Sequence, residues 1–112
     1  MITALFDSID TKDINAFANF LAEDVIFCFS NWPQIEGKAN VENAVNAFLQ
    51  SMAVIEHQVS DCWQPDDMVI CRGFVTYTRH DHTKLTVPFA NMLQVLDGKI
   101  TDYQIFADLS AL

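Results

Sequence analysis

The order of hydrophobic and polar positions divides the chain into a largely helical first part and a strand-rich second part. Apolar residues at helical spacing from Ile2 to Ile9 predict a short first helix. A second apolar stripe predicts another helix over residues 11–22, with Asp10 and Asp13 expected to cap its free backbone N–H groups. Because only two or three residues would join these helices, we expect them to pack as a helical hairpin.

The period of the pattern then changes from helical to extended. Val25, Phe27 and Phe29 alternate with apolar or small residues, which predicts a strand buried on both faces. After a loop, helical spacing resumes and predicts a third helix over residues 41–52, with Asn40 as its cap. A helical pair, a strand and a third helix therefore precede the rest of the chain.

The remainder of the chain predicts four long strands separated by turn signals. The strands are expected over residues 54–64, 68–79, 84–96 and 99–107, and the turns at Pro65–Asp67, His80–Thr83 and Asp97–Gly98. Helices followed by an antiparallel meander predict an α+β fold in which three helices pack on a strongly curved antiparallel sheet. Such a cone-shaped barrel encloses a pocket wherever the helices fail to fill the curve of the sheet.

Length and apolar content agree with this fold and add an expectation about assembly. The chain has 112 residues, of which 51% are hydrophobic and 12% aromatic. That length suits one domain over residues 1–112, because a single hydrophobic core fills a chain of this size. An antiparallel sheet with a second apolar face needs a cover, so we expect a homodimer formed through the convex face of the sheet.

Charge and cysteine usage restrict the partners and the compartment. Fifteen acidic and six basic residues give a formal net charge of −9, which repels phosphates and disfavours nucleic acid and anionic membranes as partners. No apolar run approaches the roughly 20 residues of a membrane helix. The three cysteines have no CxxC spacing and predict reduced thiols, and Asp7 comes too early for a signal peptide. We therefore predict a cytoplasmic protein.

The chain resembles the SnoaL-like group of the nuclear-transport-factor-2-like superfamily in the order and spacing of several short segments. These segments are Phe20–Phe27, Pro33–Lys38, His57–Asp61, Val75–Thr78 and Asp97–Tyr103, continuing to Asp108. The resemblance implies the same cone fold. The superfamily includes ketosteroid isomerases, polyketide cyclases, limonene epoxide hydrolases and scytalone dehydratases, together with non-catalytic binding domains. A fold shared so widely does not name a reaction.

Asp108 and His57 are the candidate catalytic residues. The resemblance places Asp108 where relatives often carry a pocket carboxylate, and burial in an apolar cone would raise its pKa toward the range of a general base. His57 begins the first long strand, where relatives often have a histidine near the pocket, and imidazole titrates near neutral pH. The alternatives are an exposed strand-end carboxylate for Asp108 and a structural histidine for His57.

Six further residues are candidates for ligand binding. Trp32 and Asn31 follow the first strand, where Trp32 offers a flat apolar wall and Asn31 a hydrogen-bond donor. Tyr77 and Asn91 would add polar groups to the pocket, with core packing as the alternative. If Asp108 faces inward, strand alternation brings two more residues to the pocket and turns Tyr103, Ile105 and Ala107 outward. Those two inward residues are Gln104 and Phe106, and Asp102 falls on the same side of the strand.

Several expected absences and departures limit the function. His80 and His82 alternate at a hairpin tip with no third ligand in the pattern, so we expect no metal site, and nothing in the sequence calls for a cofactor. Cys71–Val75 lacks the Arg-x-Asp of the epoxide hydrolases, and the first helix lacks the tyrosine of the ketosteroid isomerases. The sequence thus predicts a domain that binds a small apolar molecule and isomerises, cyclises or dehydrates it, or else a non-catalytic binding or dimeric scaffold module.

Overall fold

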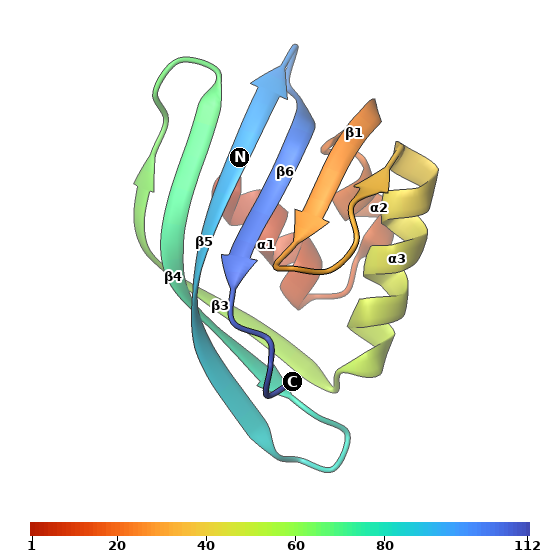
Figure 1. The fold of residues 1–112 in the computed structure, drawn as a ribbon, viewed down its shortest axis with the longest axis vertical. Helices are drawn as coiled ribbons and strands as arrows, with labels where there is room; N and C mark the ends of the chain where they lie inside the picture. Colours follow the sequence, from red (N-terminus) through yellow and green to blue (C-terminus); the bar gives the residue numbers. More distant parts are fainter.

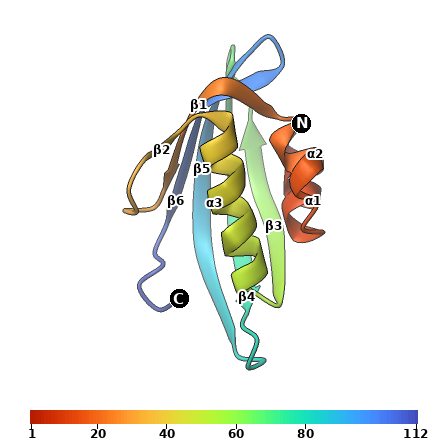
Figure 2. The same ribbon diagram turned by 90° about the vertical axis from the view of Figure 1, so that its right-hand side faces the viewer.

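The structure is a computed structural model that describes residues 1–112, and it consists of three helices packed on one face of a six-stranded sheet (Figures 1 and 2). None of the helices is long and apolar enough to cross a lipid bilayer. The elements are α1 (Ile2–Asp10), α2 (Ile14–Ala18), β1 (Leu21–Phe29), β2 (Ile35–Glu36), α3 (Lys38–Ser51), β3 (Val54–Trp63), β4 (Met68–Thr78), β5 (Lys84–Leu96) and β6 (Lys99–Ala107).

The sheet has the strand order β2-β1-β6-β5-β4-β3. All neighbours are antiparallel except β1 and β6, which run parallel with Cys28 opposite Gln104. The sheet is therefore mixed, and the expected purely antiparallel sheet is wrong at this one pair. It is curled but not closed, since β2 and β3 remain as free edges, so the α+β cone fold is confirmed without a complete barrel.

The four long strands and their turns agree with the sequence pattern to within one residue at every end. The tip at residues 80–83 and the Asp97–Gly98 turn are also as predicted. Asp97 and Gly98 both have positive φ, at 52° and 76°, which is the geometry that an Asp-Gly hairpin turn favours. The conformation of a turn depends on the few residues that form it, and this explains why the predicted ends of these strands agree so well with the observed ones.

The second helix is much shorter than the predicted helix over residues 11–22. Asp13 is its N-cap, as expected, and accepts a hydrogen bond from the backbone N–H of Ala16 at 3.1 Å. The helix ends at Ala18 because the chain then joins the sheet, where the carbonyl of Phe20 accepts from the backbone N–H of Ile100. A long-range strand pairing therefore replaces the last helical turn.

Two smaller expectations about the first half are also wrong. Helix α3 begins at Lys38 behind Gly37, whose φ of 89° suits glycine, and Asn40 lies inside the helix and donates to the carbonyl of Glu36. Strand β1 is fully buried on one face only: Val25 and Phe27 lie in the core, whereas the alternate positions are half-buried or exposed. Its other face has no helix over it.

The pairing of β3 with β4 is irregular near the middle of the two strands. The register of this pair shifts between Val59 and Asp61, and there the backbone of β3 lies directly against Gly73 of β4. A Cβ at position 73 would lie 1.9 Å from the carbonyl oxygen of Gln58. Only glycine fits this approach, and an irregularity of this kind increases the local bend and twist of a strand.

We predict that Gly73→Ala destabilises the protein by about 3 kcal/mol, because the added methyl must push two paired backbones apart. Gly98→Ala is the matched control: its Cβ meets nothing within 4 Å, and only the positive φ opposes it, at a cost of about 1 kcal/mol. Urea unfolding of the three proteins measures both costs. A loss for Gly73→Ala no larger than that for Gly98→Ala would contradict the close approach of the two strands at Gly73.

Candidate functional site

A pocket of about 100 Å³ lies between the concave face of the sheet and the helices. Seventeen of its twenty lining residues are hydrophobic, so its interior disfavours charge that is not paired. The lining residues are Phe6, Ile9, Phe17, Phe27, Phe29, Trp32, Pro33, Ile35, Ala44, Val45, Phe48, Leu49, Ile55, His57, Val75, Tyr77, Phe89, Asn91, Tyr103 and Ile105.

A run of aromatic rings forms one wall of the pocket. The ring centroid of Phe29 lies 5.0 Å from Trp32 and 5.1 Å from Phe48, and Phe48 in turn lies 5.7 Å from Tyr77. Trp32 is 45% exposed and so lies at the rim. The structure thus places Trp32 and Tyr77 at the pocket, as the sequence suggested, while their part in binding a ligand stays a prediction.

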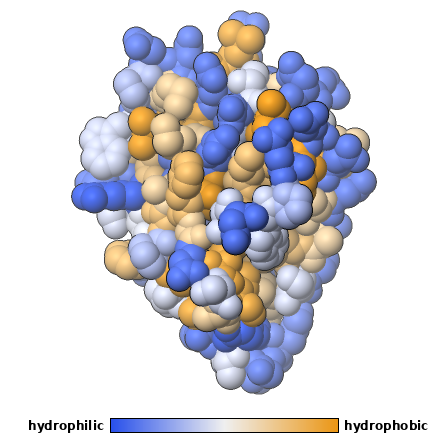
Figure 3. Space-filling view, in the orientation of Figure 1, coloured by the Kyte–Doolittle hydropathy of each residue, from blue (hydrophilic) through white to orange (hydrophobic).

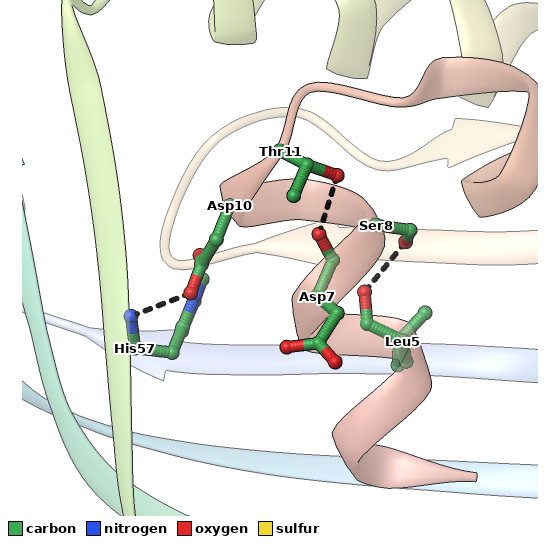
Figure 4. Close-up of polar contacts among 6 residues, drawn as sticks. All are labelled: Leu5, Asp7, Ser8, Asp10, Thr11 and His57. Carbon is green, nitrogen blue, oxygen red and sulfur yellow. Dashed lines mark hydrogen bonds and ion pairs between the residues drawn. The ribbon is translucent and has the colours of Figure 1, made fainter.

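His57 is held at the pocket by Asp10, the last residue of α1 (Figure 4). Its ring Nδ1 lies 2.6 Å from Oδ1 of Asp10, and its backbone N–H donates to Oδ2 of the same carboxylate at 3.0 Å. One carboxylate therefore binds both the ring and the main chain of His57. Because Asp10 ends a helix and His57 lies in β3, this pair also joins the helical layer to the edge of the sheet.

Two phenylalanine rings fix the orientation of the imidazole. Phe6 stacks on it with centroids 4.3 Å apart and an interplanar angle of 13°, and Phe89 meets it edge-on at 5.4 Å. A carboxylate only accepts hydrogen bonds, so Nδ1 carries the proton that faces Asp10. In the neutral ring the lone pair is then on Nε2, which makes no hydrogen bond within the chain. This arrangement leaves His57 able to accept a proton from a molecule in the pocket.

Three other polar side chains line the pocket: Tyr77, Asn91 and Tyr103. Burial raises the pKa of Tyr77 to about 12. Burial also raises the pKa of Tyr103 far above its usual range, with nearby Cys71 and Tyr77 adding to the shift. Both phenols stay protonated at neutral pH. Oδ1 of Asn91 is buried without a hydrogen-bond partner, a state that costs about 1–3 kcal/mol if nothing satisfies it.

The expected pocket carboxylate at Asp108 is wrong. Asp108 follows the end of β6, is exposed, and its Oδ1 accepts a hydrogen bond from the backbone N–H of Ser110 at 3.0 Å. That bond lowers the pKa of Asp108, the opposite of the shift expected from burial. The chain leaves the sheet at Ala107 and turns to solvent, and the carboxylate bound to His57 is Asp10 instead.

Moving Asp108 out of the pocket also reverses the expected faces of β6. Tyr103 and Ile105 line the pocket, whereas Gln104 and Phe106 point to the convex side, where Phe106 is 52% exposed. The expected faces of β6 are counted from Asp108, which lies beyond the last residue of the strand. Counting alternate positions from there gives the wrong face for each of them. Asn31 lies in the turn after β1 and does not line the pocket.

Sequence reasoning missed Asp10 and Tyr103. Asp10 lies one helical turn after Phe6, on the apolar stripe of α1, and a carboxylate on such a stripe is a signal of a buried partner. It was interpreted as a helix cap because a nearby helix start explains an aspartate equally well. Tyr103 alternates with the polar Asp102 and Gln104, and that alternation alone would have turned the tyrosine inward.

The histidines of the β4–β5 tip have local roles. Nε2 of His80 lies 3.0 Å from the carbonyl oxygen of Gln50, and Oδ1 of Asp81 accepts from both the backbone N–H and the hydroxyl of Thr83. No group of three or more histidine, cysteine, aspartate or glutamate side chains is arranged to hold a metal ion. The tip is held together by its own hydrogen bonds.

Comparison with known proteins identifies relatives of this fold. The family model described as a SnoaL-like domain matches residues 2–103. No curated protein matches the chain in sequence.

Three solved structures illustrate the likeness, each sharing the fold at low sequence identity. A protein of ketosteroid isomerase-like fold from Catenulispora acidiphila, in complex with trimethylamine, has a TM-score of 0.89 at 17% identity, over 97% of this chain and 85% of that one. TerC co-crystallised with polyporic acid has a TM-score of 0.86 at 18% sequence identity, and the match covers 98% of this chain and 90% of TerC. A candidate polyketide cyclase from Xanthomonas campestris pv. campestris has a TM-score of 0.83 at 21% sequence identity, and the match covers 98% of this chain and 89% of that one.

The two buried phenols predict an unusual alkaline titration, because Tyr77 and Tyr103 are the only tyrosines of the chain. Absorbance at 295 nm should show no tyrosine ionisation near pH 10, the value for an exposed phenol. Both folded-state pKa values are raised, so the stabilising contribution of the two protonated phenols is complete below about pH 10. The contribution of Tyr77 is lost as pH rises through about 12, and that of Tyr103 at still higher pH. Ionisation should therefore coincide with unfolding. A tyrosine that titrates near pH 10 in the folded protein would contradict the burial described here.

Proposed function

This chain belongs to the SnoaL-like domain family, and we propose that it binds a small, largely apolar molecule in its pocket and transfers a proton on that molecule. The observation that carries the proposal is the Asp10–His57 pair at a pocket lined mostly by hydrophobic residues. An apolar site with one oriented, partly desolvated base is suited to removing a proton from carbon.

The proposed chemistry uses His57 as the base and Asp10 as its positioning residue. Nε2 takes a proton from the carbon next to a carbonyl group, and the electron pair of the broken C–H bond moves into the carbonyl to give an enolate. Asp10 stabilises the imidazolium that forms. Return of the proton from Nε2 to another carbon isomerises the molecule. If the enolate expels a hydroxyl group from the β carbon, that oxygen takes the proton and leaves as water, which dehydrates the molecule. If the enolate carbon attacks a second carbonyl of the same molecule, a ring closes and the new alkoxide takes the proton.

Tyr77 is placed to support the oxygen of that enolate. It lies on β4 opposite Ile55, and His57 lies on β3 opposite Val75, so the two side chains are diagonal neighbours on the concave face. The raised pKa of Tyr77 keeps its phenol protonated and able to donate a hydrogen bond. The pair His57 and Tyr77 thus supplies a base and a donor from adjacent strands.

Some of the solved structures that share this fold hold small organic molecules. One of them was solved with trimethylamine and another with polyporic acid, so both bind small organic molecules. A third carries the name of a candidate polyketide cyclase, a class of enzyme that closes rings next to carbonyl groups. For this chain, an uncharged carbonyl compound of about one ring suits a cavity of about 100 Å³.

The alternative is a non-catalytic binding domain. It is favoured by the absence of any carboxylate among the residues that line the pocket, since Asp108 faces solvent and Asp10 lies behind His57. On this alternative the Asp10–His57 pair is a structural tie between α1 and β3 and nothing more. The two functions differ in one measurable respect, because only the first accelerates proton exchange on a bound ketone.

We predict that the protein accelerates exchange of the α-protons of cyclohexanone or 2-cyclohexenone in D₂O, followed by ¹H NMR. His57→Gln should lower the rate at least about 100-fold, the usual contribution of a general base. Asp10→Asn should lower it at least about tenfold, because the tautomer and orientation of the ring are then no longer fixed.

Asp108→Asn serves as the matched carboxylate control, and its rate should stay within about twofold of the wild type. Circular dichroism of every variant checks that the fold is intact. Binding of the ketones without any exchange above buffer would favour the non-catalytic domain. A His57→Gln variant as active as the wild type would remove His57 from the mechanism.

We also propose that two copies of the chain pair through the convex face of the sheet. Trp63, Ile70 and Met92 form one row across β3, β4 and β5, and Phe74 and Phe106 flank it. All but Ile70 are strongly exposed. Figure 3 shows hydrophobic side chains gathered over the middle of this face, with hydrophilic ones around them. A sheet face of this kind, called here the convex patch, suits a second copy of itself.

Sedimentation equilibrium should give a dimer at micromolar concentration, and Phe106→Glu should shift it to a monomer, because the substitution would bury two charges in a symmetric interface. Leu96→Glu is the control: Leu96 is also exposed, but it is the last residue of β5 and is not part of the convex patch. A wild type that stays monomeric at 100 µM or so would contradict the dimer, since a stable interface buries about 1,200–2,000 Å².

A further inference from the structure

The pocket contains a second polar pair that the proton transfer proposed above does not use. Asn91 lies on β5 and is only 2% exposed, and its Oδ1 has no hydrogen-bond partner in the protein. A buried amide oxygen without a partner is rare in folded proteins, because the oxygen has given up water and received nothing in exchange. Asn91 lines the pocket, so a molecule in the pocket is positioned to supply the missing donor.

Tyr103 is the neighbour of Asn91 on the concave face. Asn91 pairs with Ile105 and Leu93 pairs with Tyr103, so the amide and the phenol are diagonal neighbours on adjacent strands. The ring of Tyr103 is packed against Phe27 at 5.2 Å. Its hydroxyl makes no hydrogen bond within the chain although the residue is 1% exposed. Two unpartnered polar groups therefore face the same cavity from β5 and β6.

The chemistry of this pair selects a neutral group. No lysine or arginine lines the pocket, so an anionic group would be buried there without a counter-charge. An amide and a protonated phenol each donate and accept, and a hydroxyl group of a ligand does the same. The remaining walls are apolar, and the cavity of about 100 Å³ is of the size that holds about one ring.

We propose that Asn91 and Tyr103 bind the hydroxyl group of a ring compound that is otherwise apolar, and that they select such a compound over a hydrocarbon of the same shape. The inference rests on the proposed function only in using the same pocket, since it concerns recognition and not proton transfer. The hydroxyl donates to Oδ1 of Asn91 and accepts from Tyr103. His57 and Tyr77 line the same pocket from β3 and β4, toward the other edge of the sheet.

The test compares phenol with toluene, which differ by a hydroxyl in place of a methyl group, in ¹⁵N-HSQC titrations of the full chain. Asn91→Leu keeps the side-chain shape and removes the amide. It should weaken phenol binding about tenfold, the effect of one lost hydrogen bond. Toluene should bind Asn91→Leu as tightly as the wild type or more tightly. Tyr103→Phe, which removes only the hydroxyl, should also weaken phenol binding and leave toluene binding as tight as in the wild type or tighter.

Gln104→Leu is the matched control, because Gln104 lies on β6 beside Tyr103 but on the convex side, and both affinities should stay unchanged. If Asn91→Leu weakens phenol and toluene equally, Asn91 only supports the fold and the proposal is wrong. Unchanged phenol binding would mean that water alone satisfies Asn91, which also overturns it. A wild type that binds neither phenol nor toluene would overturn the proposal as well. Loss of ketone exchange with the phenol preference intact would count against proton transfer alone.

Discussion

The close crossing of β3 over β4 at Gly73 is the constraint on which the rest of the structure depends. The carbonyl of Gln58 lies where a Cβ of residue 73 would be, so the two strands approach more closely than any other residue allows. The register of β3 against β4 shifts at this point, and β3 lies beside α1 (Figure 2). Without curvature, the inner face of the sheet would be flat, and the helices would pack on it without leaving a pocket.

The fold brings together two side chains from distant parts of the chain. Asp10 at the end of α1 and His57 on β3 are 47 residues apart in sequence, yet they share two hydrogen bonds. The carboxylate thus stabilises the contact between helix and sheet and also fixes one protonation form of the imidazole. Phe6 and Phe89 exclude water around that ring. The same few contacts hold α1 against β3 and orient the imidazole.

The sequence predicts the parts of the fold that depend on local chemistry. Turns such as Asp97–Gly98 require particular residues, so the four long strands are positioned correctly. The parallel pairing of β1 with β6 and the early end of α2 result from contacts distant in sequence, which no local pattern contains. The candidate site shows the same difference between local and distant information. His57 can be predicted from its place in the first long strand, where relatives often have a histidine. Asp10 cannot, because an aspartate there fits a helix cap equally well until its partner on β3 is known.

The central claim is that Asp10 holds His57 with its proton on Nδ1 and its lone pair on Nε2 at the pocket. The most direct measurement is the ¹⁵N chemical shifts of the His57 ring in labelled protein at a pH where the ring is neutral. The account predicts the Nδ1–H form in the wild type, and a shift toward the usual mixture of both forms in Asp10→Asn. A wild type with the proton on Nε2 would contradict it, because His57 would then have no free lone pair to offer a ligand.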